Sequence, residues 1–204
     1  MSKYVIVGAS AAGISAVEAI REVDQTGTIT IISDEQCPQY SRPMISDLVS
    51  GKADFGKMMC REHDFWEKNK IQALTGRTAI GLNLADKYVM LDKGEHVSFE
   101  KLLIATGGKP FVPKIEGSDK NGVLTFTTLS DAESLVAKLK EVEHALVIGA
   151  GLIGVSVTDA LVKKGLKVTM VELQDKILSL ILDPIASEIV EKTIRKAGVT
   201  IATG

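Results

Sequence analysis

Two stretches of this chain, VIVGASAAGISA and LVIGAGLIGVSV, carry small residues at matching positions. The upstream stretch contains Gly8, Ser10, Ala11, Ala12 and Gly13, and the downstream stretch contains Gly149, Gly151, Leu152, Ile153 and Gly154. In such a turn the first glycine permits a sharp bend, the second lets backbone approach a pyrophosphate, and the third lets a helix pack closely on a strand. The N–H groups at the start of the helix then attract phosphate. Each stretch therefore predicts a dinucleotide-binding turn.

The upstream turn departs from this pattern at its second position. Ser10 stands where Gly151 stands downstream. A serine adds a side chain where the backbone should approach the ligand, although its hydroxyl can itself donate to a phosphate oxygen. The downstream turn is thus the more specific of the two signals.

Acidic residues follow both turns at the end of the next apolar run. Asp34 and Glu35 follow TITIIS, and Glu172 closes KVTMVE. A carboxylate at this point accepts hydrogen bonds from ribose hydroxyls. Acid there also repels a 2′-phosphate, and no arginine closely follows Glu172, so we expect the downstream site to prefer NAD to NADP.

The elements that must position these residues are apolar strands and the helices between them. The runs KYVIV, TITIIS, KYVML, KLLIAT, ALVIG, KVTMVE and VTIAT read as strands. Most do not alternate with polar residues, which is typical of parallel sheets covered on both faces. We predict an α/β fold of two Rossmann-like, three-layer units, divided in the Gly- and Pro-rich stretch near Gly117 into domains 1–116 and 117–204.

Composition narrows the class of partner. The 204 residues include 24 basic and 26 acidic side chains and have a net charge of −2, which gives no basic surface for nucleic acid or an anionic membrane. The apolar run near the N-terminus reads as a buried strand and a helix, so we expect a cytoplasmic protein. Cys37 and Cys60 lie in no disulfide framework, and Cys60 with His63 lacks a second pair of ligands, so no metal site is predicted.

With a third stretch, KLLIATGGKPFVPKIEG, the whole chain resembles the FAD-dependent pyridine nucleotide oxidoreductases. This group includes NADH-dependent rubredoxin and ferredoxin reductases, NADH oxidases and the flavin portion of NADH-dependent nitrite reductase. The resemblance implies that the upstream turn holds FAD, with Glu35 on the adenosine ribose, and that the downstream turn and Glu172 hold NADH. It also implies FAD contacts at Ala79, Ala105, Thr106 and Gly107, and, from the P-x-Y-x-R-P segment, at Arg42 and Pro43.

Three features of the sequence depart from the family pattern. Ser156 replaces a glutamate that many relatives place near the nicotinamide amide. The segment SRPMISDLVSG lacks the redox cysteine of the disulfide- and oxygen-reducing branches. No Gly-Asp dipeptide of the kind that closes the family's flavin site occurs, so we expect these residues to be the larger part of the FAD domain and the first part of the NADH domain, inactive alone.

The resemblance implies hydride transfer from NADH to FAD, with electrons passed on to a small electron-carrier protein or a metal centre. The cofactors carry this chemistry, so we assign no catalytic side chain. Two alternatives stay open: a thiol-independent flavin NADH oxidase, and a regulatory protein that binds flavin and NADH without turnover. The sequence leaves the acceptor and any homo-oligomer undetermined.

Overall fold

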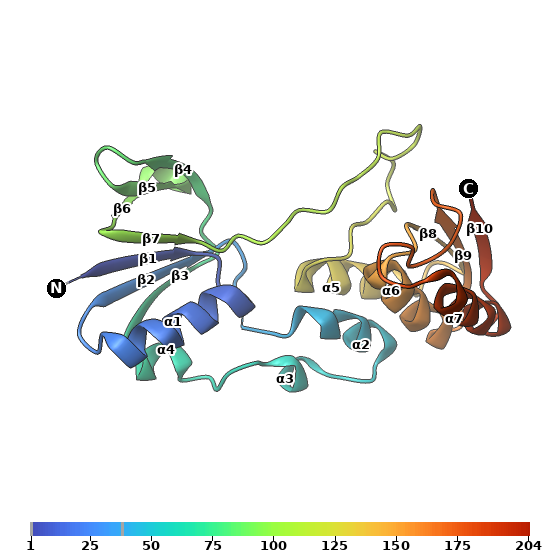
Figure 1. Ribbon diagram of the computed structural model, residues 1–204, viewed down its shortest axis with the longest axis horizontal. Helices are drawn as coiled ribbons and strands as arrows, with labels where there is room; N and C mark the ends of the chain where they lie inside the picture. The colour runs from blue at the N-terminus through green and yellow to red at the C-terminus, as the bar shows by residue number, and fades with distance from the viewer. Residues whose placement is uncertain (1, 38) are drawn as a thin grey trace. The chain divides into compact units, whose positions relative to one another are not determined.

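The computed structural model describes residues 2–37 and 39–204, which form two compact units (Figure 1). The chain up to Ser41 and Met58–Gly108 make the first unit, and Arg42–Lys57 and Lys109–Gly204 make the second. The chain therefore leaves the first unit for a 42–57 excursion, returns, and leaves again after Gly108. The division predicted near Gly117 lies inside the second unit.

The first unit is built on a parallel sheet in the order β3-β2-β1-β7. Its strands are β1 (Lys3–Val7), β2 (Thr28–Ser33), β3 (Ile71–Thr75) and β7 (Lys101–Ile104). Val5 pairs with Thr30 on one side and with Leu102 on the other. All of β2 after its first residue is buried, as its unbroken Ile- and Thr-rich run predicts.

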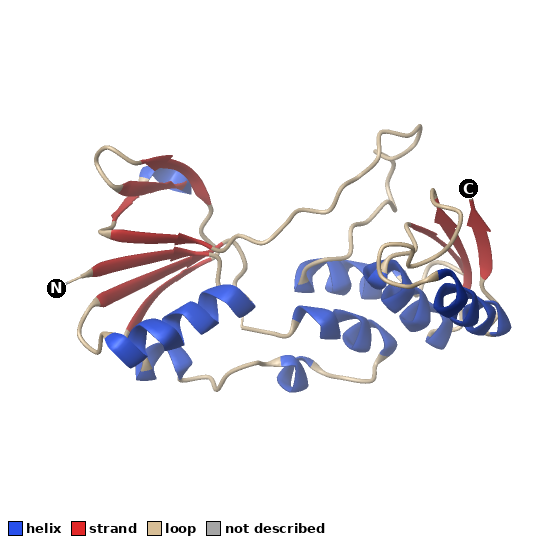
Figure 2. Cartoon of the chain, in the orientation of Figure 1, coloured by secondary structure: helices blue, strands red, loops and turns tan. Residues whose placement is uncertain are grey.

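Neighbouring residues of β1 face two different layers. Ile6 packs against Ile14 and Val17 of α1 (Ala11–Val23). Val5 packs against Val89 in a three-stranded antiparallel sheet. Figure 2 shows the helices on one side of the parallel sheet and these strands on the other. This unit therefore has three layers, completed by α4 (Phe65–Lys68), β4 (Ala79–Asn83), β5 (Tyr88–Leu91), the 3-10 turn Asp92–Gly94 and β6 (His96–Ser98).

The second unit repeats the same strand–helix–strand order. Its parallel sheet runs β10-β9-β8, with β8 (His144–Ile148), β9 (Lys167–Glu172) and β10 (Thr200–Thr203). The core around Val147 and Met170 takes in residues of α5 (Leu129–Lys138), α6 (Leu152–Lys163) and α7 (Pro184–Lys196). The predicted α/β class with parallel sheets is confirmed.

The 42–57 excursion contributes a helix to the second unit. It contains the 3-10 turn Arg42–Met44 and α2 (Ile45–Ser50), which packs on α5 and α6, and it leads into α3 (Phe55–Met58). On the far face of β8 from the core, Leu146 is 60% exposed and Ile148 is 52% exposed. In the described residues, the helices of this unit thus cover one face of its sheet.

Two details differ from the sequence-based expectations. The run KYVML lies in the antiparallel layer and not in a parallel sheet, because only alternate side chains of β5, Val89 and Leu91, are buried. The strands β3, β4 and β6 were not predicted, since their apolar residues are interrupted by glutamine, glycine or histidine.

Candidate dinucleotide sites

The first glycine turn is closed by the end of β7. The Gly8 N–H donates to Ile32 O at 2.8 Å, and the Ala105 N–H donates to Val7 O at 2.7 Å. Gly8 has a φ of +111°, and a Cβ there would lie 2.1 Å from Ala105 O and 3.0 Å from Thr106 N. The predicted residues Gly8, Ala105 and Thr106 are therefore brought together, and only glycine fits at position 8.

The third glycine of this turn sets the distance between helix and strand. A Cβ on Gly13 would lie 1.9 Å from Gly8 O. Ser10 is the N-cap residue of α1, whose first turn contains no acidic side chain. The exposed Ala11 and Ala12 lie in that first turn. The backbone here can approach a pyrophosphate at the positive end of the helix dipole, so the residues present fit such a group.

Glu35 lies just beyond β2, where the sequence predicts a ribose contact, and a tyrosine holds it. The Tyr40 hydroxyl donates to Glu35 Oε2 at 2.6 Å, and Tyr40 is only 2% exposed. Asp34 is exposed and Glu35 is half-buried. Tyr40 is the tyrosine of the P-x-Y-x-R-P segment, but that segment was used only for Arg42 and Pro43, so the bond of Tyr40 to Glu35 was not predicted.

The remaining residues predicted for FAD are dispersed over both units. Ala79 opens β4 and packs on the core around Val5. Gly107 follows Thr106 with a φ of +67°. Arg42 and Pro43 lie in the second unit, where Arg42 Nη1 donates to Thr127 O at 2.9 Å. Pro38, which opens the P-x-Y-x-R-P segment, lies outside the described residues. Contact of these residues with a flavin stays a prediction.

The second turn has the geometry of the first. The Gly149 N–H donates to Val171 O at 2.8 Å, as Gly8 does to Ile32. A Cβ on Gly154 would lie 2.0 Å from Gly149 O, whereas nothing lies within 4 Å of a Cβ on Gly151. Gly149 has a φ of +98°. The turn is thus tight where helix meets strand and open where a phosphate would approach.

Glu172, at the end of β9, is tied to this turn by backbone hydrogen bonds. Its carboxylate accepts from the Gln174 N–H at 2.9 Å and from the Ala150 N–H at 2.7 Å. These hydrogen bonds hold the pKa of Glu172 below its ordinary value, against the opposing effect of burial. Glu172 is therefore an ionised acceptor fixed beside the glycine turn, in the position expected of a ribose-binding acid.

Leu152 and Ile153 form the start of α6, directly after the turn. They are 65% and 55% exposed. The N-cap of α6 is Gly151, which has no side chain to cap the helix, and the first turn holds no acid. Apolar side chains thus border a helix N-terminus that can accept an anionic ligand.

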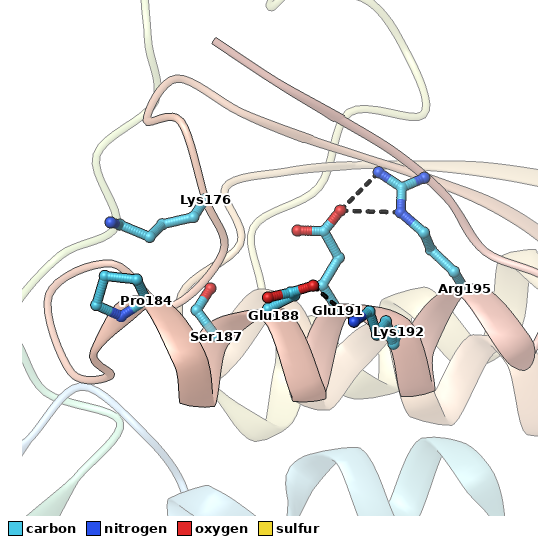
Figure 3. A pocket seen from close by; sticks show the side chains of 7 residues that line it. All are labelled: Lys176, Pro184, Ser187, Glu188, Glu191, Lys192 and Arg195. Carbon is cyan, nitrogen blue, oxygen red and sulfur yellow. Dashed lines mark hydrogen bonds and ion pairs between the residues drawn. The ribbon is translucent and has the colours of Figure 1, made fainter.

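A surface hollow of about 340 Å³ lies along α7, apart from the predicted residues (Figure 3). Its lining is Lys176, Pro184, Ser187, Glu188, Glu191, Lys192 and Arg195. Four of its five charged side chains are paired with one another, Lys192 with Glu188 and Arg195 with Glu191. Among the described residues no cluster of three metal-ligating side chains occurs, and none of their helices is long and apolar enough to cross a membrane.

Residues 2–204 match the family described as pyridine nucleotide-disulphide oxidoreductase. The chain belongs to this family. It is 37% identical over its whole length to the NADH-dependent phenylglyoxylate dehydrogenase subunit epsilon of Aromatoleum evansii, of which it covers 48%. It is 31% identical to a rubredoxin-NAD(+) reductase of Pseudomonas putida over 96% of its length, which is 51% of that protein.

Solved structures of this oxidoreductase family share the fold. The covalent putidaredoxin reductase–putidaredoxin complex matches all of this chain with a TM-score of 0.90 at 29% identity, over 50% of the solved chain. The chain thus spans about half the length of each of these three proteins. The predicted resemblance to the pyridine nucleotide oxidoreductases is confirmed.

Proposed function

We propose that this chain provides the FAD site and part of the NADH site of an NADH:acceptor oxidoreductase. The observation that carries the proposal is the pair of glycine turns, each followed by a strand-end acid that another group of the same unit holds in place. One turn is closed by Ala105 and has Glu35 at its ribose position, and the other has Glu172. Two dinucleotides require two such turns.

FAD, when bound, supplies the chemistry by accepting a hydride from NADH and releasing electrons to the acceptor. The residues of this chain bind and orient. The turns at Gly8 and Gly149 would place backbone N–H groups against the two pyrophosphates. We keep the proposed division into an FAD domain, 1–116, and an NADH domain, 117–204, although residues 42–57 and 109–116 lie in the second compact unit. The residues proposed for each site are those given from the sequence.

The acceptor that we propose is a small electron-carrier protein or a downstream metal centre. Support comes from the relatives, one named as a rubredoxin reductase and another seen joined to putidaredoxin. The relative named as a dehydrogenase subunit is compatible with an acceptor in a companion subunit. Both Cys37 and Cys60 are free and exposed, which fits a route that uses no disulfide.

The test is cofactor analysis and turnover of the whole protein. We expect the purified protein to release FAD on denaturation and to reduce an artificial acceptor with NADH. NADH should be preferred to NADPH by roughly ten- to a hundredfold in kcat/KM, because Glu172 favours ribose hydroxyls and repels a 2′-phosphate. Glu172→Gln should reduce this preference. Release of FMN, or equal kcat/KM for both donors, contradicts the assignment.

Two outcomes separate the alternatives. Oxygen consumption equal to NADH consumption, unchanged by added carrier protein, identifies an NADH oxidase. A long-lived complex of reduced flavin and NAD without turnover identifies a regulatory protein.

A further inference from the structure

A short segment, Tyr40–Ser46, supplies a side-chain contact to a binding element in each unit. It belongs to neither glycine motif. Its first two residues lie in the first unit and the rest in the second, and each contact described below lies within one unit. The contacts are those of Tyr40 with Glu35 and of Ser46 with Ser156.

At the Tyr40 end, contacts of the backbone hold the segment in place. Tyr40 forms an antiparallel bridge with Met59, and the Ser41 N–H donates to Met58 O at 2.8 Å. The ring is buried and its hydroxyl is 2.6 Å from Glu35 Oε2. A short hydrogen bond to a charged acceptor is stronger than one between neutral groups, so Tyr40 holds this carboxylate in one orientation.

At the Ser46 end, a directed chain of hydroxyl groups connects α6 to α2. The Ser156 hydroxyl donates to Ser46 Oγ at 2.7 Å, and the Ser46 hydroxyl donates to Pro43 O at 3.3 Å. Ser156 lies two residues after Gly154, in the second turn of α6. The bond therefore acts on the part of α6 that directly follows the open glycine turn.

The packing of α2 on α6 is close, but it is less directional than this bond. Ile45 and Val49 are buried, and a Cβ on Gly51 would lie 3.2 Å from Lys164 Nζ near the far end of α6. Apolar contacts have no preferred direction, whereas the hydrogen bond of 2.7 Å between Ser156 and Ser46 depends on both distance and angle. Arg42, bonded to Thr127 O, anchors the start of the excursion beside α5.

We propose that Tyr40 and Ser46 are positioning residues for the two dinucleotides. Tyr40 fixes the carboxylate of Glu35 for the FAD ribose, and Ser46, through Ser156, fixes the first turns of α6 for NADH. The inference rests on the proposed function, because it takes the first turn as the FAD site and the second as the NADH site. Neither the glycine pattern nor the family resemblance assigned a role to Ser46, or to Tyr40, which is the tyrosine of the P-x-Y-x-R-P segment.

The experiment compares Tyr40→Phe with Ser46→Ala in the whole flavoprotein, and each variant is the control for the other. Tyr40→Phe should raise the FAD dissociation constant roughly three- to tenfold and leave the KM for NADH of the FAD-loaded enzyme unchanged. Ser46→Ala should raise the KM for NADH by a similar factor, with kcat within about twofold and FAD affinity unchanged. Ser46→Thr keeps the hydroxyl and should restore the KM.

Unchanged FAD affinity in Tyr40→Phe, or an unchanged KM in Ser46→Ala, overturns the proposal. The proposal is also overturned if either variant loses both FAD affinity and NADH binding. It is likewise overturned if the KM for NADH of Ser46→Thr is no lower than that of Ser46→Ala, since either result indicates general loosening of the fold. Urea unfolding of each variant measures that loosening directly. A wild-type protein that binds no FAD or oxidises no NADH instead refutes the proposed function, so the two failures are distinguishable.

Discussion

At the scale of single residues, the glycines of the second turn do different physical work. A Cβ on Gly154 would collide with the carbonyl oxygen of Gly149, and backbone has to move to relieve it. A Cβ on Gly151 meets no protein atom within 4 Å, so a side chain at this position would obstruct only a bound ligand. The same substitution at the two positions therefore separates folding from binding.

We expect Gly154→Ala to lower the free energy of unfolding by about 2 kcal/mol or more, because overpacking against backbone is poorly relieved. Gly151→Ala should cost at most about 1 kcal/mol, the penalty of replacing an N-cap glycine. It should nevertheless weaken NADH binding at least tenfold, because the added methyl group would enter the space that we propose for the phosphate. Urea unfolding and NADH titration of both variants check this. Equal effects of the two substitutions on stability would contradict the assigned roles.

The sequence predicted the geometry of both glycine turns, with an acid at the end of the following strand, because this geometry depends on local spacing. Gly8, Gly13 and Glu35 belong to one strand–helix–strand unit, as do Gly149, Gly154 and Glu172. Tyr40 and Ser46 were not predictable in this way. The partner of Ser46 is Ser156, which is distant in the sequence, and only the packing of α2 on α6 brings the two hydroxyls together.

At the scale of elements, strand prediction succeeded where a run is continuously apolar, even in β8, whose Leu146 and Ile148 are exposed. The strands β1, β2, β8 and β9 are rich in Val and Ile and were all predicted. The strand β3, IQALT, is an edge strand with an exposed Gln72, so its pattern resembles a loop. The membership of α2 in the second unit also has no sequence signal, because an amphipathic turn does not specify which neighbour it packs on.

The helices of the second unit contain two buried hydroxyl groups in contrasting states. Thr158 in α6 is 2% exposed, and its Oγ1 has no hydrogen-bond partner among the described residues. Ser187 in α7 is 1% exposed, and its hydroxyl donates to Ile177 O at 2.7 Å. Burying a hydroxyl without a partner costs free energy, whereas a satisfied one stabilises.

Thr158→Val should therefore raise the free energy of unfolding by about 1 kcal/mol, since it removes the unpaired oxygen and keeps the shape. Ser187→Ala should lower it by about 1 to 2 kcal/mol, because Ile177 O loses its donor. Urea denaturation of both variants, followed by far-UV circular dichroism, measures the two changes. A destabilised Thr158→Val protein would show that the threonine oxygen has a partner in solution.

At the scale of the whole molecule, the two units differ in how their sheets are covered. In the first unit β4, β5 and β6 cover the face of the parallel sheet that α1 leaves open. In the second, Leu146 and Ile148 are exposed on the corresponding face of β8. Neighbouring exposed apolar side chains on a sheet face favour association with another surface.

Residues 1–204 produced alone should consequently associate in solution. Replacing Leu146 and Ile148 by threonine puts a β-branched residue, which favours strands, at both positions and removes apolar surface, so the double variant should shift toward monomer. Val23→Thr is the matched control, because Val23 is 84% exposed on the other unit at the end of α1 and should leave association unchanged. Size-exclusion chromatography with light scattering, over a range of protein concentrations, gives the mass of each. If the wild-type fragment is monomeric at every concentration, exposure of this sheet face does not drive association. If the Val23→Thr control shifts toward monomer equally, the association does not depend on β8.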